Sequence, residues 1–339
     1  MNKGICCAGY MCVDSMYSVS EYPGKSELAH IVPPIETATG GSLCNTGLDI
    51  AILDPSVRVQ ACGVVGEDTY GTLMMDTLKK YPNVDTSMMV RKGTSAFSIV
   101  MNDLSDKTRT FFECEGPYAE FGEDDIAFDK LNADIFHIGY LLLMPHLDAG
   151  NPEYGTNMAK LLSRVQKMGI KTSIDVISET GEEAGKRFKK IVSPALKYTD
   201  YCIINELEAQ QVTGIVLRDD DGTLHTERFK EALEKMKELG VSTWAVIHCP
   251  EIGAGLDENG TYAEFKSLKL PKGFIKGSTG AGDAFCAGVL YAAEKELGIA
   301  EALMIGACTA AASLSEVGSI DGVKALPEVM KLYGMYGEQ

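Results

Sequence analysis

The sequence has 339 residues, and its 48 acidic against 31 basic residues give a net charge of −17. Nucleic acids and anionic membrane surfaces bind basic protein faces, so this charge argues against both as partners. It does not exclude ATP, because local N–H groups, a lysine or two and Mg²⁺ can hold one phosphate chain. The ten cysteines form no C-x-x-C pair and lie mostly in apolar runs, and no run reaches the roughly 18 apolar residues of a membrane span. We therefore expect reduced thiols and a cytoplasmic protein.

Short elements of mixed type are predicted over the first third of the chain. They are, in order, a strand over 4–10, an irregular excursion with one or two short strands over 15–38, a helix from Leu48 to Leu53, a strand over 57–65, a helix over 70–80 and a β-hairpin over 94–114. Asp14 stands after the first strand. The two β-rich excursions, 15–38 and 94–114, are expected to form a small second layer.

From about residue 130 onward, strands and helices alternate. Strands are predicted over 134–139, 170–175, 200–204, 243–248 and 262–269, with helices over 155–168, 181–197, 206–213 and 226–239. Alternation of this kind is typical of a parallel sheet covered by helices on both faces. No repeat or linker divides the chain, so we expect one α/β domain over residues 1–339.

A carboxylate late in the chain, Asp283, follows a run of small residues and precedes an apolar helical pattern. The small residues are Gly280, Ala281 and Gly282. Ser278 or Thr279 is predicted to cap the helix, so that the N–H groups of 280–282 point out of its N-terminus, where anions bind. An anion cradle beside a carboxylate suits transfer of a phosphoryl group to a hydroxyl, because the carboxylate accepts the hydroxyl proton. Taken alone, the stretch also fits a Gly-rich loop before an ordinary helix.

Three other polar spots lie at predicted strand ends, where open α/β sheets bind ligands. They are Asp14, the segment Gly40-Gly41 to Asn45, and the pair Asn205 and Glu208. Each has a purely structural interpretation: a turn, a plain loop, and a helix N-cap with Glu at its third position. Their order along one parallel-sheet chain favours a shared site. The five histidines show no ligand spacing for zinc, and neither a dinucleotide fingerprint nor a P-loop is present, which counts against a dehydrogenase and a P-loop NTPase.

These motifs together resemble the ribokinase-like (PfkB) carbohydrate kinases over nearly the whole chain. Residues 277–285, Gly-Ser-Thr-Gly-Ala-Gly-Asp-Ala-Phe, are similar to the family signature D-T-T-G-A-G-D-x-F. Gly40-Gly41 followed by Asn45 is similar to the N-terminal signature, residues 63–71 to the family pattern G-x-x-G-x-D-x-x-G, and Asn205 to Glu208 to its N-x-x-E motif.

The resemblance implies a kinase that uses ATP and Mg²⁺ to phosphorylate a hydroxymethyl group of a small sugar, or of a nucleoside. Asp283 would be the general base, and residues 280–282 the anion hole. The resemblance assigns sugar hydroxyls to Asp14, Gly40, Gly41 and Asn45, and the nucleotide to Asn205, Glu208, Gly253, Ser278 and Thr279. Glu208 would contact Mg²⁺ through water. The β-rich excursions would form a lid over the sugar that, in some members, also makes a homodimer.

Two departures from the family pattern leave alternatives open. Gly277 replaces an aspartate linked to a monovalent-cation site, which puts such a cation in doubt. Residues 248–253 keep only Gly253 of the family's T-L-G-x-x-G nucleotide loop, and Pro250 removes an N–H there. The donor contacts are therefore expected to differ, and a non-catalytic sugar or nucleotide sensor is the second function class. A phosphorylated sugar would need cations near Asp14, for which Lys107 and Arg109 are the candidates.

Overall fold

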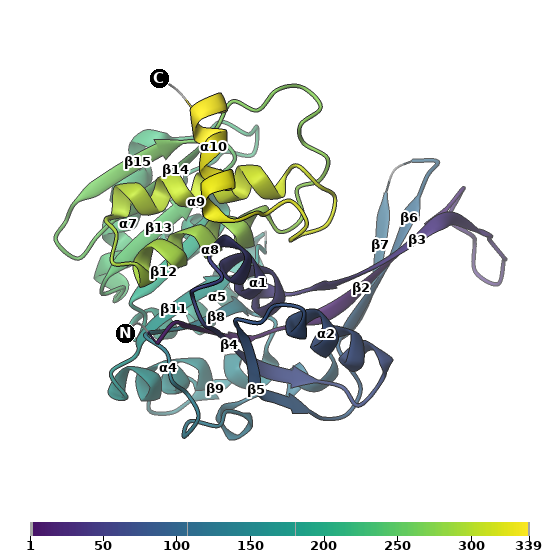
Figure 1. The fold of residues 1–339 in the computed structure, drawn as a ribbon, viewed down its shortest axis with the longest axis horizontal. Helices are drawn as coiled ribbons and strands as arrows, with labels where there is room; N and C mark the ends of the chain where they lie inside the picture. The colour runs from purple at the N-terminus through teal and green to yellow at the C-terminus, as the bar shows by residue number, and fades with distance from the viewer. Residues whose placement is uncertain (1–2, 107, 180, 338–339) are drawn as a thin grey trace.

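The computed structural model describes residues 3–106, 108–179 and 181–337. In this part of the chain, the body is built on one sheet in the order β15-β14-β13-β12-β11-β8-β1-β4-β5 (Figure 1). The strands from β13 to β5 run parallel to their neighbours, and β14 and β15 extend one edge antiparallel. The predicted α/β architecture with a mostly parallel sheet is confirmed.

The strands of this sheet are β1 (Ile5–Gly9), β4 (Val59–Val65), β5 (Val84–Arg91), β8 (Ile135–Leu141), β11 (Lys171–Val176), β12 (Tyr201–Asn205), β13 (Trp244–His248), β14 (Ile252–Leu256) and β15 (Tyr262–Lys266). The α-helices are α1 (Ser42–Leu53), α2 (Thr69–Lys79), α3 (Pro145–Asp148), α4 (Asn157–Lys167), α5 (Glu182–Leu196), α6 (Glu206–Thr213), α7 (Phe229–Leu239), α8 (Ala281–Glu294), α9 (Ile299–Ser313) and α10 (Leu326–Tyr336). A two-residue pair, β9 (Gly150–Asn151) and β10 (Gly155–Thr156), precedes α4.

Strand β1 shows how the sequence builds two cores. It lies between β4 and β8, and its side chains alternate between the faces of the sheet. Cys6 and Ala8 pack in the core that contains α4, α5 and α7, whereas Ile5 and Cys7 pack in the core that contains α8 and α9. Because both faces are covered, the strand is a continuous apolar run without polar alternation.

A second, four-stranded sheet projects from the body as an arm (Figure 1). Its order is β3-β2-β6-β7, with β2 (Cys12–Val19), β3 (Ile31–Gly40), β6 (Phe97–Asp103) and β7 (Arg109–Cys114). The predicted hairpin is confirmed as β6 and β7, and the predicted second layer as this sheet. Asp14 follows the first strand as predicted, but it belongs to a second strand that the sequence did not predict there. Asp14 lies inside β2, paired with Ala38 of β3, because the chain re-enters a strand two residues after β1 ends.

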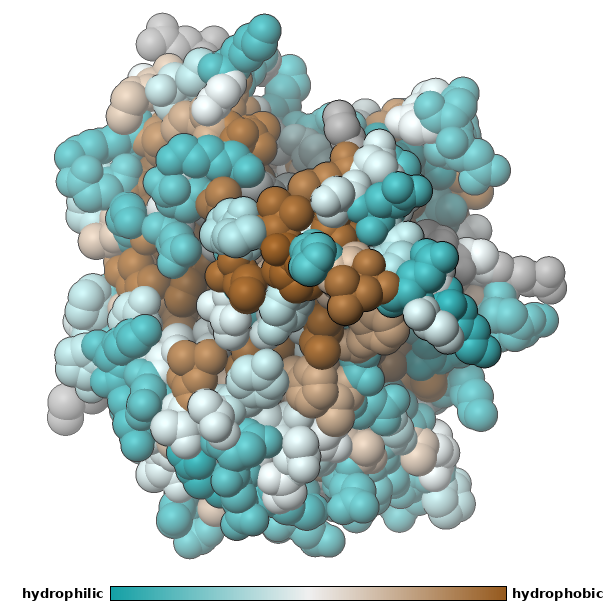
Figure 2. Space-filling view, turned by 90° about the vertical axis from the view of Figure 1, so that its right-hand side faces the viewer, coloured by the Kyte–Doolittle hydropathy of each residue, from teal (hydrophilic) through white to brown (hydrophobic). Residues whose placement is uncertain are grey.

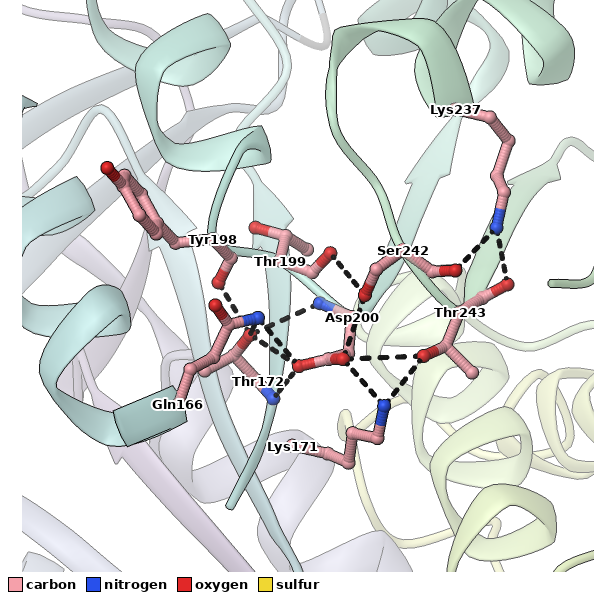
Figure 3. Close-up of polar contacts among 9 residues, drawn as sticks. All are labelled: Gln166, Lys171, Thr172, Tyr198, Thr199, Asp200, Lys237, Ser242 and Thr243. Carbon is pink, nitrogen blue, oxygen red and sulfur yellow. Dashed lines mark hydrogen bonds and ion pairs between the residues drawn. The ribbon is translucent and has the colours of Figure 1, made fainter. Parts of the chain in front are cut away.

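One buried carboxylate connects the amino ends of three neighbouring strands of the parallel sheet, β11, β12 and β13 (Figure 3). Asp200 is buried and accepts hydrogen bonds from Lys171 Nζ at 2.8 Å, from the Thr172 N–H at 2.9 Å and from Ser242 Oγ at 2.8 Å. Burial alone would raise the pKa of Asp200, but the bonds from Lys171 and Thr172 hold it below the usual range. The network therefore stabilises the fold, and it lies at the end of the sheet opposite to the carboxyl ends of the strands, where open α/β sheets bind ligands.

Asp49 of α1 is the opposite case. It is fully buried, and neither carboxyl oxygen has a partner among the described residues. Burial, with Asp283 nearby, raises the pKa of Asp49 well above its ordinary value. A group whose pKa is higher in the folded state stabilises the fold fully only below its unfolded pKa of about 3.9, and that contribution is lost as pH rises through the folded pKa.

We therefore expect Asp49→Asn to raise the free energy of unfolding at pH 7, by at least about 1 kcal/mol, with a gain that grows as pH rises from about 4. The matched variant Asp200→Asn should lower stability at pH 7 by about 2 kcal/mol, and its deficit should shrink as pH falls below about 4. Urea unfolding across this pH range measures both. Equal losses in the two variants would contradict the assignment of Asp49 as an uncompensated buried carboxyl.

Candidate active site

The N-terminus of α8 places Asp283 in its first turn. The predicted caps, Ser278 and Thr279, are wrong: the N-cap is Gly280, with no side-chain cap bond. Gly280 has a φ of 80°, and a Cβ at this position would lie 2.7 Å from the Cβ of Ser319. Only glycine meets both constraints without strain, so the turn that aims this helix depends on it.

Polar side chains from two other elements hold the carboxylate of Asp283. Oδ2 accepts hydrogen bonds from Asn45 Nδ2 and from the Tyr140 hydroxyl, each at 2.9 Å, and the Thr46 hydroxyl lies 3.5 Å from Oδ1. Asn45 in turn accepts a 2.9 Å bond from Ser319. The first turn of α1 and the end of β8 thus fix the orientation of a carboxylate that lies at the start of α8.

Burial governs the protonation of this site. It raises the pKa of Asp283, and the bonds from Asn45 and Tyr140 offset part of that effect by stabilising the ionised form. Burial also raises the pKa of Asp175 well above its usual range, with the nearby carboxylates of Asp283 and Glu208 adding to the rise. Among the described residues, no lysine or arginine side chain lies against these carboxylates, so their negative charge is not neutralised by the protein.

Backbone N–H groups beside Asp283 are the candidates for the predicted anion cradle. The N–H of Ala281 bonds to the carbonyl of Ser278 at 3.3 Å. For Gly282 and Asp283, no backbone acceptor is found among the described residues. These two groups carry the positive end of the α8 dipole, so the cradle rests on them more than on Ala281.

Asn205 and Glu208 form the capping box that the sequence predicted at the start of α6. Asn205 Oδ1 accepts from the Glu208 N–H at 2.9 Å, and Glu208 Oε2 accepts from the Asn205 N–H at 2.8 Å. Glu208 Oε1 also accepts from Ser178 at 2.7 Å. Burial raises the pKa of Glu208 to about 7 despite these bonds. The capping role is therefore real, and the same carboxyl faces the cavity described next.

Two adjacent cavities meet at the N-terminus of α8. The first, about 310 Å³, is the more polar of the two; its lining includes Tyr140, Asp175, Asn205, Glu208, Gly280, Asp283 and Cys286. The second, about 510 Å³, is largely apolar; its lining includes Leu268, Leu270, Ile275, Ser278, Phe285, Ala307 and Ala311. Asn205, His248 and Gly282 line both. The pair can accommodate a molecule with a flat apolar part and a charged tail.

His248 stands between the two cavities at the end of β13. Its ring stacks on Phe285 with centroids 4.8 Å apart, and a Cβ at Gly282 would lie 3.4 Å from its Cε1. Burial lowers the pKa of His248 to about 4, so the ring is neutral at pH 7. No hydrogen-bond partner for its nitrogens is found in the described part of the chain, so they are free to meet a ligand.

The residues predicted to bind a sugar lie along one path from the arm to α8. A Cβ at Gly40 would lie 2.5 Å from Asp14 Oδ2, so only glycine leaves room for that carboxylate. Gly41 is the N-cap of α1 with a φ of 91°, and Asn45 follows in the first turn. The structure thus brings Gly40 to Asp14 and Asn45 to Asp283. Burial raises the pKa of Asp14.

The altered loop at 248–253 is a tight connection between β13 and β14. Gly253 pairs with His248, is buried, and would place a Cβ 2.9 Å from the Phe285 ring. Gly253 lines neither cavity. It packs against Phe285, whereas the sequence predicted a contact with the nucleotide. Arg218 secures the loop, since it binds Glu206 at 2.7 Å and Glu251 at 2.7 and 3.1 Å. Thr279 likewise lines neither cavity.

Gly277, just before the loop that leads into α8, leaves little room for a side chain. A Cβ there would lie 3.0 Å from the carbonyl oxygen of Val317 and 3.1 Å from that of Glu316. The adjacent Lys276 pairs with the Glu316 carboxylate at 3.0 Å. The aspartate of the family pattern would not fit this backbone without a shift.

Sequence reasoning missed Asp175, Tyr140, Thr46 and His248. Asp175 and His248 stand at the carboxyl ends of predicted strands, so the signal that singled out Asn205 would also have found them. Asp175 and Glu208 offer oxygen ligands of the kind that Mg²⁺ prefers.

Within the described residues, no helix is long and apolar enough to cross a membrane.

Comparison with known proteins decides the family. The sequence model for "pfkB family carbohydrate kinase" matches residues 2–326. The chain belongs to this family of carbohydrate kinases. The predicted family and fold are thereby confirmed.

Individual relatives of this kinase are distant. It is 25% identical to the probable fructokinase-7 of Arabidopsis thaliana, with 97% of this chain and 92% of the relative covered, and 22% identical to a nucleoside kinase of Methanocaldococcus jannaschii, with 90% and 88% covered. It is 23% identical to the bifunctional protein HldE of Wolinella succinogenes over 84% of this chain, and this match spans only 55% of HldE. Among solved structures, Arabidopsis thaliana ribokinase complexed with ribose and ATP superposes with a TM-score of 0.81 at 20% identity, with 98% of this chain and 99% of that chain covered.

Proposed function

We propose that this PfkB-family kinase transfers the γ-phosphate of ATP to a hydroxymethyl group of a small sugar, with Asp283 as general base. The observation that carries the proposal is the position of Asp283. Its carboxylate is held by Asn45 and Tyr140 at a helix N-terminus and lines the polar cavity. A hydroxyl placed against it would lose its proton as it attacks a phosphoryl group held by the Gly282 and Asp283 N–H groups.

ATP would occupy both cavities. The adenine would fill the apolar cavity, and the phosphates would pass His248 and Gly282 into the polar one. Asp175 and Glu208 would hold Mg²⁺, Glu208 through water. Mg²⁺ would supply the charge that shields the phosphate oxygens, while Asp283 itself handles the proton.

The acceptor would lie between Asp14 on the lid and Asp283 on α8. A solved relative contains ribose and ATP, and other relatives carry the names fructokinase and nucleoside kinase. A neutral sugar is favoured over a phosphorylated one because Asp14 offers a carboxylate to hydroxyls, and a nucleoside stays the alternative acceptor. The two residues predicted as candidates for binding a sugar phosphate, Lys107 and Arg109, give no further information, because Lys107 and the side chain of Arg109 lie outside the described part of the structure. A monovalent cation is not part of the proposal, given Gly277.

A thermal-shift screen of ribose, fructose, 2-keto-3-deoxygluconate and nucleosides, followed by coupled ADP release for the hits, tests this function. We expect one neutral sugar to raise the melting temperature and to support Mg²⁺-dependent ADP release. A nucleoside as the sole hit would favour the alternative acceptor. Sugar binding in calorimetry without ADP formation at any level of Mg²⁺ or ATP would instead indicate a non-catalytic sensor. The altered 248–253 loop is the reason for considering this alternative.

His248 is expected to contribute to binding of the phosphate donor. A hydrogen bond to a charged phosphate is worth about 1.5–3 kcal/mol, so His248→Ala should raise the KM for ATP by about 10-fold or more, with a smaller change in kcat. Sugar affinity should stay unchanged. His225→Ala is the matched control, because that histidine lies outside both cavities and pairs with Asp219 and Glu227. An unchanged KM for ATP in His248→Ala would remove this contact from the account.

The lid would also form a homodimer interface. Its outer strands expose large apolar side chains, namely Ile31 and Ile35 of β3 and Phe111 and Phe112 of β7. Figure 2, which views the molecule from the lid side, shows hydrophobic surface gathered near its centre. Such surface is unusual on a monomer. Sedimentation of the parent and of Ile35→Lys would show a dimer that becomes a monomer; a monomeric parent would contradict this part of the proposal.

A further inference from the structure

A polar stripe crosses the face of the parallel sheet beneath α1 and α8. His137 of β8 and Ser173 of β11 are paired in register, and His137 Nδ1 lies 3.0 Å from Ser173 Oγ. Two residues further along, Gly139 and Asp175 continue the stripe to the polar cavity, and a Cβ at Gly139 would lie 3.2 Å from Asp175 Oδ2. All the side chains in this stripe are buried.

Cys286 of α8 completes a set of three different ligand atoms. A nitrogen of His137, a carboxylate oxygen of Asp175 and the sulfur of Cys286 all lie within 4.8 Å of one another. Sequence spacing had excluded a zinc site, but it could not detect this set, because its members come from β8, β11 and α8. Such a mixture of imidazole, carboxylate and thiolate is suited to Zn²⁺, whereas Mg²⁺ binds oxygen ligands.

We propose that His137, Asp175 and Cys286 form an inhibitory zinc site in the floor of the polar cavity. The site itself stands on these three residues; only its effect on turnover rests on the proposed kinase function. Three protein ligands with an open fourth position are typical of exchangeable zinc sites. Here the fourth position faces the cavity, since Asp175 and Cys286 line it, so water or a phosphate oxygen would fill it.

Zinc binding needs only local adjustments. Zinc bonds of about 2.0–2.3 Å require the three ligand atoms to draw together by about 1 Å. The Cys286 thiol forms the Zn–S bond and releases its proton to solvent. His137 Nε2 becomes free to ligate when the Ser42 hydroxyl, 3.3 Å away, turns aside. The Nδ1–H of His137 then donates to Ser173, the outer-shell bond that metal-bound histidines usually make.

Inhibition follows from the shared carboxylate. Zinc and the proposed Mg²⁺ would share the Asp175 carboxylate, so zinc bound below would draw charge from this ligand and repel the catalytic cation. We therefore expect micromolar Zn²⁺ to inhibit Mg²⁺-dependent turnover reversibly, with recovery on adding a chelator. Measured against its own Mg²⁺-dependent rate, Cys286→Ala should need at least about tenfold more Zn²⁺ for half inhibition.

Cobalt(II) titration of the reduced, full-length protein tests the site without any turnover. The parent should develop a near-ultraviolet thiolate-to-cobalt charge-transfer band together with the visible bands of a four-coordinate ion, and Zn²⁺ should displace both. Cys286→Ala and Cys286→Ser should lose the charge-transfer band. Cys202→Ala, which removes another buried thiol, should retain it. Circular dichroism checks that each variant is folded.

A charge-transfer band that is absent from the parent, or that persists in both folded Cys286 variants, would overturn the proposal. Since the cobalt spectrum needs neither sugar nor ATP, a failure of the kinase assignment would leave it intact. Conversely, an active kinase without the cobalt band would reject the zinc site alone.

Discussion

Replacing Asp283 with asparagine is expected to lower kcat for the best sugar by about 10²–10⁴-fold, because the variant cannot accept the hydroxyl proton. Asparagine has nearly the same shape, so sugar and ATP should still bind with little change. In the parent, kcat/KM should rise with pH as Asp283 ionises, with a midpoint above that of an ordinary aspartate because burial raises its pKa. The variant should lose this pH dependence.

Steady-state rates from pH 5 to 9, with calorimetric binding of sugar and ATP, measure the effect of Asp283→Asn. Tyr140→Phe provides a matched comparison, since it removes one hydrogen bond to the same carboxylate and keeps the base. It should cost much less than Asp283→Asn and should raise the pH midpoint, because the lost hydrogen bond stabilises the ionised carboxylate. A variant Asp283→Asn that turns over within tenfold of the parent would remove Asp283 from the role of base.

Gly280→Ala is expected to damage the site severely although it adds only one methyl group. The new Cβ would meet Ser319 at 2.7 Å and would force a side chain into a backbone with a φ of 80°. The first turn of α8 would shift, and with it the Gly282 and Asp283 N–H groups. Loss of one such donor costs about 10²–10³-fold in rate, so we expect kcat to fall by at least that amount.

Gly298→Ala is the matched control for Gly280→Ala. Gly298 is the N-cap of the neighbouring α9, has an ordinary φ of −76°, and has open space where the methyl would go. Its turnover and melting temperature should stay close to the parent's. If Gly280→Ala retained both full turnover and parent-like ATP affinity, the N-terminus of α8 would not be the anion site.

The order of strands and helices could be predicted from the sequence because the hydrophobic pattern of each element lies within that element's own residues. Strand β1 and the strands β8, β11, β12 and β13, which alternate with helices, were each predicted. Strand β14 was missed because two of its five residues are glycine; Gly253 and Gly255 are there to admit the side chains of Phe285 and Ile299. A requirement of that kind lies in distant helices and leaves no local signal.

The site was predictable to the extent that its residues carry motifs. Asn45 bonds to Asp283, and Asp283, Asn205 and Glu208 line the same cavity. The role of Ser278 and Thr279 as caps was predicted wrongly because glycine with a positive φ replaces a side-chain cap at this turn. His137, Asp175 and Cys286 were not grouped, since only the sheet register and the packing of α8 bring them together.

Phosphorus NMR of a reaction with ATP, Mg²⁺ and the best sugar from the screen tests whether Asp283 activates the sugar hydroxyl for phosphoryl transfer. We expect a new phosphomonoester signal that grows in equal amount to ADP and is almost absent with Asp283→Asn. Release of ADP with only inorganic phosphate, or a phosphomonoester formed at the parent rate by Asp283→Asn, would contradict it.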